Sequence, residues 1–346
     1  MNLIPRKEED KLENIKIIND DENKIKFDVE ILKELGNTHI ELMELLNTRI
    51  NDFKTNRDIH DYINDFVCEN YLNLAFPIGI SINQVIAHDT YHPNNIITLK
   101  EGDFVTVDVG FYQDGNIIDA ARTFTYKNEL HKSISDCENY VNRIEDYIRK
   151  ELDKNGFVNI QRISKMTELL VNTGGYTGVS YLGGHNVELG KVHGSKLILN
   201  KPLTSLHSQA GNLVDKDAIL SRGEMFCIEI YMGEKLSEGQ MIRSTKIPIT
   251  HFELYDYVDK NKMTKKEAEI YDSIMEETEG YAYNYGVHER FNKDKKILEN
   301  MIKKEYIIPH YPLEYKSSMG TMVKFTQHEN TFIITTEGEL INLTKK

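Results

Sequence analysis

The sequence has few cysteines, and their arrangement excludes two kinds of protein. Three cysteines occur among 346 residues, at Cys68, Cys137 and Cys227. An odd number at such wide separations does not form a disulfide framework, and it lacks the close pairs of a zinc-binding motif. Free cysteines are usually buried, so we expect three inert thiols in the core of a protein from a reducing compartment, the cytoplasm.

Long apolar runs are missing as well. No stretch of about 18 consecutive apolar residues occurs, so the sequence predicts no membrane-spanning helix. Residues 1–27 are rich in charge where a secretory signal would be apolar, and we expect them to form a loosely ordered segment.

Positive charge is in deficit, with 42 Lys and Arg against 55 Asp and Glu and a formal net charge of -13. Nucleic acids and anionic membranes both attract clustered basic residues, so neither is expected as a direct partner. A cationic substrate group or a bound metal ion suits this balance better. Hydrophobic residues make up 40% of the chain, which is long enough to bury a substantial core.

Helical and strand-like segments alternate in blocks along the chain. A helix is expected over 28–51, interrupted near Gly36, and a second helix begins after Thr55, a residue type that caps helices. The expected order continues with strands over 74–127, helices over 134–153 and 160–172, strands and loops over 180–250, helices over 264–305 opened by a capping box, and strands over the last forty residues. The block helix-helix-strands thus occurs twice, which predicts an α+β fold. We interpret residues 28–346 as one domain with a helical insertion at about 255–307.

Residues 107–126, VDVGFYQDGNIIDAARTFTY, place two aspartates on an expected hairpin. The Asp-Gly dipeptide at 114–115 favours a two-residue turn. Asp108 then lies opposite Ala121, and Asp119 is its diagonal neighbour on the same face, roughly 7 to 8 Å away between backbones. Carboxylates so placed repel one another unless a cation lies between them. A three-residue loop would instead put Asp119 on the other face, and a solvated strand residue beside a turn residue remains the simpler alternative.

Other segments add metal-ligating residue types. His185 and His193 lie in a Gly-rich stretch, where a backbone can approach a ligand closely. Glu229 and Glu329 each lie in or beside an apolar run, where burial of an unpaired carboxylate is costly. Each of these residues alone is a weak signal, but two Asp, one His and two Glu form an oxygen-rich set suited to a pair of Mn, Fe, Co or Zn ions.

These segments, in this order, resemble a known family. The quoted segments are VTVDVG and GNIIDAARTFT, Gly-Gly-His at 183–185, Ile-Glu-Ile at 228–230, Gln-His-Glu-Asn-Thr at 327–331, LAFPIGISINQVIAH ending in His88, and PHYPLEY around Tyr311. Together they resemble methionine aminopeptidases of the second type, in peptidase family M24, which have the pita-bread fold. The helical block between Glu229 and Glu329 resembles the insertion that separates the second type from the first.

The resemblance implies a role for each matching residue. The implied metal ligands are Asp108, Asp119, His185, Glu229 and Glu329, with Asp119 and Glu329 bridging two divalent ions (Co, Mn, Fe or Zn). The implied catalytic residues are Glu229 as proton shuttle, His193 as donor to the carbonyl oxygen and His88 near the scissile amide. The implied substrate-binding residues are His88, His193, Phe76, Tyr311 and His251. The implied reaction is removal of the N-terminal methionine from nascent polypeptides by metal-activated water, in a monomer for which the ribosome is a candidate partner.

Two other functions are compatible with the sequence. One is an X-Pro aminopeptidase or prolidase of the same fold, and the other is a pita-bread protein that binds partners without catalysis. The family pattern is also broken at four positions, by Asp89, Ile230, His328 and Asn330. None of the four is an implied ligand, so we expect them to alter the rate and the metal preference through residues around the ions.

Overall fold

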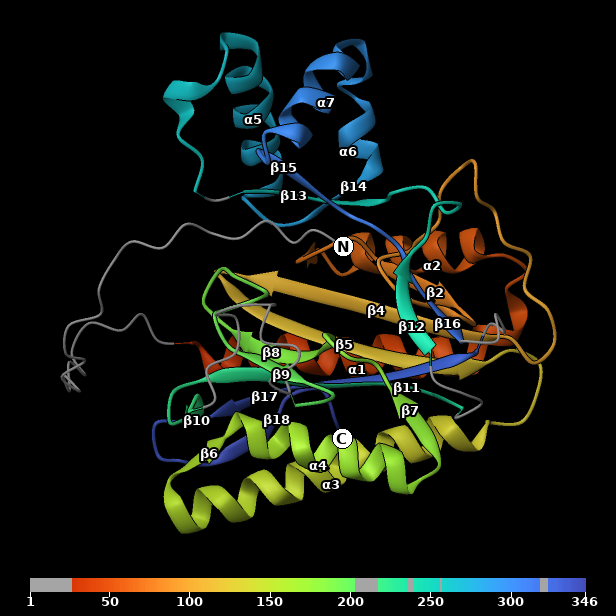
Figure 1. Cartoon of the computed structure of the whole chain (residues 1–346), viewed down its shortest axis with the longest axis vertical. Coiled ribbons are helices and arrows are strands. Elements are labelled where there is room, and N and C mark those ends of the chain that lie inside the picture. The colour runs from red at the N-terminus through yellow and green to blue at the C-terminus, as the bar shows by residue number, and fades with distance from the viewer. Residues whose placement is uncertain (1–26, 203–216, 235–238, 256, 318–322) are drawn as a thin grey trace.

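One antiparallel sheet forms the centre of the molecule (Figure 1). The computed structural model describes residues 27–202, 217–234, 239–255, 257–317 and 323–346, so the expected N-terminal segment 1–27 lies outside the described residues except for Phe27. The sheet contains β1 (Asn73–Leu74), β2 (Gly79–Ile82), β4 (Phe104–Gln113), β5 (Asn116–Thr125), β7 (Tyr176–Gly178), β8 (Gly183–Val187), β9 (Leu197–Leu199), β11 (Met225–Glu234), β17 (Phe325–Ile334) and β18 (Leu340–Asn342). Its main path runs β1-β4-β5-β17-β11-β8-β9.

Two helix pairs cover the two halves of this sheet. Helix α1 (Val29–Arg49) packs on β4 and β5 and shares its apolar core with α2 (Asn56–Glu69), while α3 (Lys132–Asn155) packs on β11 and β17 and shares a second core with α4 (Ile160–Thr173). The N-cap expected at Thr55 is present, and Asp58 completes a capping box with it. The predicted α+β class with two similar halves is therefore confirmed.

A smaller lobe stands apart from the sheet at the top of Figure 1. It combines α5 (Lys265–Thr278), α6 (Tyr285–Glu289) and α7 (Lys295–Lys303) with a three-stranded sheet of β13 (His251–Leu254), β14 (Tyr283–Asn284) and β15 (Ile307–His310). The capping box expected at Thr264 and Glu267 opens α5. The lobe has its own core around Phe252 and Ile270. The expected helical block is thus present, with short strands at its base.

Two short sheets complete the described elements. Strand β6 (Phe157–Asn159) pairs with β10 (Ile219–Ser221). Strand β16 (Leu313–Ser317) lies between β12 (Gly239–Arg243) and β3 (Val85–Ala87), and so links the chain that leaves the small lobe to the segment before His88.

The register of the β4-β5 hairpin is the one that a two-residue turn predicts. Gln113 pairs with Asn116 and Asp108 pairs with Ala121, so the turn is Asp114-Gly115. Asp119 pairs with Gly110, which lies two residues from Asp108 on the same strand. Because side chains two apart on a strand share a face, both aspartates project from the same side of the sheet.

Two expectations drawn from the sequence were wrong. Helix α1 is continuous through Gly36. The glycine is buried against the C-terminal segment, where a Cβ would lie only 2.0 Å from the Leu343 carbonyl oxygen. The glycine therefore makes room for the C-terminal segment instead of interrupting the helix. Cys68, at the end of α2, is exposed, whereas Cys137 and Cys227 are buried as expected, and all three are free thiols.

We predict that Gly36→Ala destabilises the protein by about 1 to 3 kcal/mol, the usual range for overpacking. If Gly36 were only a poor helix former, alanine would instead stabilise the helix by up to about 1 kcal/mol. The sign of the change in unfolding free energy, measured with urea, separates the two explanations. Asn37→Ala, at the exposed neighbouring position of α1, serves as the control and should be neutral or slightly stabilising.

Candidate metal centre

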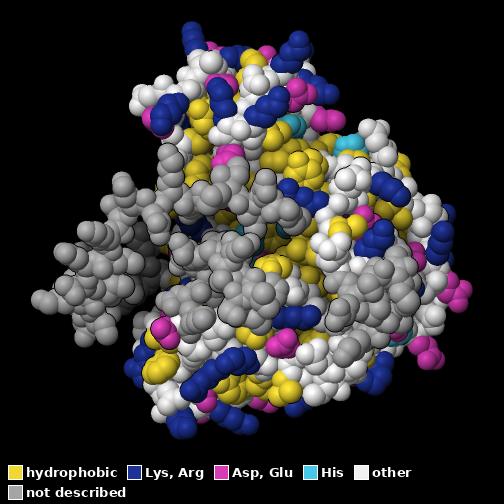
Figure 2. Space-filling model, in the orientation of Figure 1, with side chains coloured by type: hydrophobic (Ala, Val, Ile, Leu, Met, Phe, Trp, Pro, Cys, Tyr) yellow, Lys and Arg dark blue, Asp and Glu magenta, His cyan; other side chains and the backbone are white. Residues whose placement is uncertain are grey.

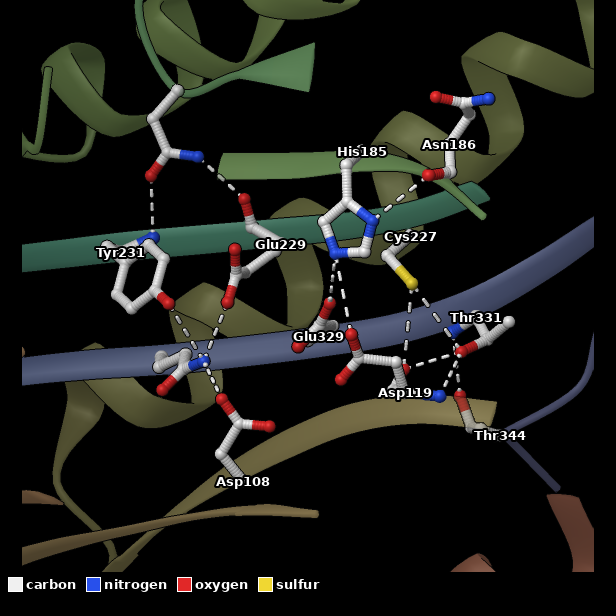
Figure 3. A network of polar contacts seen from close by, with 12 residues as sticks. Asp108, Asp119, His185, Asn186, Cys227, Glu229, Tyr231, Glu329, Thr331 and Thr344 are labelled. Atoms are coloured by element: carbon white, nitrogen blue, oxygen red, sulfur yellow. Dashed lines mark hydrogen bonds and ion pairs between the residues drawn. The ribbon is translucent and has the colours of Figure 1, made fainter. Parts of the chain in front are cut away.

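Five side chains from five strands converge on one face of the central sheet (Figure 3). Asp108 comes from β4, Asp119 from β5, His185 from β8, and Glu229 on β11 lies directly opposite Glu329 on β17. The strands that carry the four carboxylates are consecutive in the sheet order β4-β5-β17-β11. Residues far apart in the sequence therefore meet in one place.

A close approach between two strands brings His185 to the carboxylates. A Cβ at Gly184 would lie 1.9 Å from the carbonyl oxygen of Cys227, so only glycine lets β8 pack this tightly against β11. Gly184 thus contacts a neighbouring strand, and the candidate ligand is the residue beside it. Gly183, Gly190 and Gly194 of the same stretch line the cleft in front of the carboxylates.

The His185 ring presents a lone pair to the carboxylates. Its Nδ1 lies 3.2 Å from the Asn186 carbonyl oxygen, which can only accept, so Nδ1 carries the proton. Its Nε2 lies 3.4 Å from Asp119 Oδ2 and 4.0 Å from Glu329 Oε1. Burial lowers the pKa of His185 to about 4, which keeps the ring neutral. Three electron-rich atoms thus face one point, as metal ligands do, with the second ring nitrogen held by a backbone carbonyl.

The four carboxylates are crowded enough to favour protonation or a bound cation. Burial is the main cause that raises the pKa of each, to about 7 for Asp119, and the neighbouring carboxylates raise the pKa of Asp108, Glu229 and Glu329 further. Asp108 Oδ1 and Glu329 Oε1 are buried without a hydrogen-bond partner. Buried acceptors without a donor are costly, so these atoms fit a divalent ion that would occupy the space between them.

The donor atoms fall into two overlapping sets. Asp119, His185, Cys227 and Glu329 form one set, and Asp108, Glu229 and Glu329 form the other, with the donor atoms of each set within 4.8 Å of one another. Glu329 belongs to both. The residues therefore fit divalent metal. Cys227, expected to be inert, is a member of the first set, and its Sγ lies 3.8 Å from the Asp119 carbonyl oxygen.

Gln327 contacts the carboxylates but was given no role in the sequence analysis. Its Nε2 donates to Glu229 Oε1 at 2.7 Å and to Asp108 Oδ2 at 3.1 Å, and lies 3.2 Å from the Tyr231 hydroxyl. Gln327 is two residues before Glu329, and Tyr231 is two residues after Glu229. The alternation of side chains along each strand therefore predicts that both face the carboxylates. They hold the Glu229 and Asp108 carboxylates in place.

A cleft of about 810 Å³ opens from the carboxylates toward the small lobe. Figure 2 shows hydrophobic side chains gathered below the lobe on this side of the molecule. Phe76, His88, His193 and His251 line the cleft together with all five candidate ligands. His310 and Glu253, which the sequence analysis did not single out, line it too and form a pair, with His310 Nε2 3.1 Å from Glu253 Oε2.

Tyr311 is placed differently from the other expected substrate-binding residues. It is not among the described residues that line the cleft; its ring lies 4.9 Å from the guanidinium carbon of Arg243. Its carbonyl oxygen lies 3.3 Å from His88 Nδ1. Burial and the nearby His310 lower the pKa of His88 to about 3, so the His88 ring is neutral. Its single proton lies on Nδ1, which donates to the Tyr311 carbonyl oxygen, and Nε2 is left as an acceptor.

Three of the four departures from the family pattern face away from the carboxylates. Ile230, His328 and Asn330 each alternate with a residue of the candidate centre, so they project from the opposite face of the sheet, and all three are buried there. Asp89 is buried beside His88, with its Oδ1 accepting from the Thr90 amide at 2.9 Å. None of the four removes a candidate ligand.

A cluster of carboxylates and one neutral imidazole at the floor of a cleft is typical of hydrolases that use divalent metal. The chain belongs to metallopeptidase family M24, whose model matches residues 30–284.

Relatives and solved structures agree with this assignment. The chain is 28% identical to a methionine aminopeptidase of Thermococcus onnurineus over 50% of this chain and 57% of that protein. It is 24% identical to one of Methanothermobacter thermautotrophicus over 81% and 87% of the two chains. Among solved structures, a thermophilic Arx1 has a TM-score of 0.71 at 14% identity, covering 92% and 91% of the chains. The methionine aminopeptidase of Thermotoga maritima has a TM-score of 0.58 at 16% identity, covering 93% and 99%. At these identities the solved structures show the fold alone.

We predict that added metal stabilises this protein more as the pH rises. In the metal-free folded state Asp119 keeps its proton until about pH 7, whereas the unfolded chain releases it near about pH 4. Between these values the folded state binds more protons, so rising pH lowers the stability of the metal-free protein. Bound cations favour the ionised carboxylates and remove this penalty.

The measurement is the melting temperature with and without saturating Mn²⁺ at about pH 5 and about pH 7.5. The increase due to Mn²⁺ should be larger at the higher pH. Asp119→Asn, which cannot titrate at this position, should show a smaller difference between the two pH values. An equal increase at both pH values in the wild-type protein would contradict the prediction.

Proposed function

We propose that this protein is a methionine aminopeptidase that removes the N-terminal methionine from nascent polypeptides. The observation that carries the proposal is the convergence of Asp108, Asp119, His185, Glu229 and Glu329 at the floor of one cleft. Relatives named methionine aminopeptidase, including one that aligns over most of both chains, support the choice of substrate. The helical lobe between Glu229 and Glu329 supports the second type of this enzyme.

Divalent metal held by the five side chains would supply an activated water and polarise the carbonyl of the first peptide bond. Glu229, one of the five, is held in place by Gln327. Because burial raises the pKa of Glu229, the side chain can take up the proton of the attacking water and then deliver it to the leaving amine. The acidic floor would attract the cationic α-amine of the substrate.

Two histidines project into the cleft beside the carboxylates. The His193 ring centroid lies 4.3 Å from that of His185, which suits a donor to the carbonyl oxygen as negative charge develops on it. His88 is neutral and could bond the scissile amide or the leaving nitrogen through Nε2. Tyr311 would act on the substrate indirectly, since its carbonyl orients His88.

The apolar wall of the cleft offers a place for the methionine side chain. Phe76, Leu182, Leu197 and Leu199 line it. His251 also faces the cleft, but its Nδ1 bonds the Thr250 hydroxyl at 2.9 Å. We propose that Phe76 contacts the methionine side chain and that His251 mainly shapes the wall. The enzyme would work as a monomer in the cytoplasm, where new N-termini are made.

The direct test is the release of free methionine from Met-Ala-Ser by the purified chain, stripped of metal and reloaded with Mn²⁺, Co²⁺, Fe²⁺ or Zn²⁺. We expect metal-dependent release, little from Leu-Ala-Ser, and loss of nearly all turnover in a folded Glu229→Ala variant. Preference for a peptide with proline second would point to an X-Pro aminopeptidase. A folded protein that is inactive with every metal and every peptide would support the non-catalytic alternative.

A second prediction isolates the role of His193. His193→Ala should lower kcat by about 10² or more with a smaller effect on KM, because an oxyanion donor acts mainly in the transition state. The steady-state kinetics of Met-Ala-Ser hydrolysis measure this split. Ser195→Ala, at another residue lining the cleft, is the control and should change kcat little. An unchanged kcat in His193→Ala would exclude the oxyanion role.

A further inference from the structure

The junction between β5 and β17 differs from the other junctions of the central sheet. Strands β4 and β5 form a continuous ladder from Phe104 and Thr125 to the turn, and β11 and β17 form one from Met225 and Ile333 to Gly233 and Phe325. Between β5 and β17, only Arg122 and His328 meet as a ladder pair within the described residues. This junction is where the two halves of the sheet meet, and it separates Asp119 from Glu329.

Two threonine hydroxyls replace the missing ladder. In the register set by Arg122 and His328, Thr331 lies opposite Asp119. The Asp119 amide donates to Thr331 Oγ1 at 2.9 Å, and the Thr331 hydroxyl donates to the Asp119 carbonyl oxygen. One hydroxyl thus satisfies both backbone groups of a candidate metal ligand.

The same arrangement recurs in the opposite direction. Thr123 lies opposite Gln327, the Gln327 amide donates to Thr123 Oγ1 at 2.9 Å, and the Thr123 hydroxyl donates to the Gln327 carbonyl oxygen at 2.9 Å. Thr106 Oγ1 lies 2.8 Å from Thr123 Oγ1 and supplies a further bond to it. Both central threonines are buried, at 5% and 0% exposure, so water does not compete for these bonds.

We propose that Thr123 and Thr331 are positioning residues of the metal centre, which hold β5 and β17 at the separation that lets Asp119 and Glu329 share the same ions. A hydroxyl placed between an amide and a carbonyl spans more distance than a direct backbone bond, because two hydrogen bonds take the place of one. The inference rests on the proposed function, since it concerns the metal centre of that enzyme.

Other contacts fix the two strands from the far face. The Arg122 guanidinium donates to the carbonyl oxygens of Glu329 and Thr344 and, at 2.6 Å, to Asn330 Oδ1. The backbone of Glu329 is therefore held on one side by this cation, while Asp119 is held by Thr331. Loss of the Thr331 hydroxyl would leave the Asp119 amide without a partner and its carbonyl oxygen with only the weak thiol donor of Cys227, and loss of the Thr123 hydroxyl would remove the bonds that hold the Gln327 backbone groups. The strands would then shift or admit water, and the carboxylates would move with them.

The test is calorimetric titration of Mn²⁺ into the metal-free protein, at a temperature where circular dichroism shows each variant to be folded. Thr331→Val keeps the shape and removes the hydroxyl, and we expect the affinity for Mn²⁺ to fall by about 10-fold or more, as for other groups that orient metal ligands. Thr331→Ser restores the hydroxyl and should restore most of the affinity. Thr123→Val, on the other strand, should also weaken binding.

Thr167→Val is the matched control. Thr167 is buried in α4, and its hydroxyl donates to the Ile163 carbonyl oxygen at 3.1 Å, away from the metal centre. This variant should lose stability without losing Mn²⁺ affinity. Wild-type affinity in both Thr331→Val and Thr123→Val would overturn the positioning role while leaving the proposed function intact. Absence of Mn²⁺ binding by the wild-type protein would overturn both.

Discussion

The crowding of four carboxylates is the constraint on which the rest of the structure depends. Asp108, Asp119, Glu229 and Glu329 are placed on consecutive strands and face one cleft. Burial raises the pKa of each, and the neighbouring carboxylates raise the pKa of Asp108, Glu229 and Glu329 further. A sheet that carried such a cluster without compensation would be unstable, because buried charges of one sign are costly. The ordered helix pairs, the two apolar cores and the neutral His185 form the rigid frame that keeps the cluster together in spite of this cost.

The two faces of the sheet have different roles, and the face packed against the helices makes the sheet rigid. The face that carries the carboxylates is polar and opens into the cleft, whereas the opposite face packs on α1 and α3. Strand alternation lets one strand serve both purposes: Glu329 faces the cleft while Asn330 and His328 are buried on the helical side. Substitutions on the helical side can therefore accumulate while the ligand set is retained, which explains how the chain departs from the family pattern at Ile230, His328 and Asn330 with all five ligand types in place.

Local features were predictable from the sequence, and long-range ones were not. The Asp114-Gly115 turn fixes the relation of Asp108 to Asp119 over a few residues, and the capping boxes at Thr55 and Thr264 are local as well. The pairing of Glu229 with Glu329 joins residues a hundred positions apart, and no local feature of the sequence shows that their two strands are neighbours. Gly36 was misinterpreted because its neighbour, Leu343, lies at the other end of the chain. The contact of the Tyr311 ring with Arg243 could not be predicted for a similar reason, since it depends on how β12 and β16 pair.

The junction of β5 and β17 connects these observations. If the two halves of the sheet met through an ordinary ladder, backbone hydrogen bonds alone would set the distance between the carboxylates of one half and those of the other. Here the reciprocal hydroxyls of Thr123 and Thr331, with Arg122 behind them, set it through side chains. A spacing that depends on side chains can be adjusted by substitution without breaking either half of the sheet. The two halves can therefore stay rigid while the distance between Asp119 and Glu329 is tuned at the line where they meet, and this is the distance that the proposed sharing of metal ions would require.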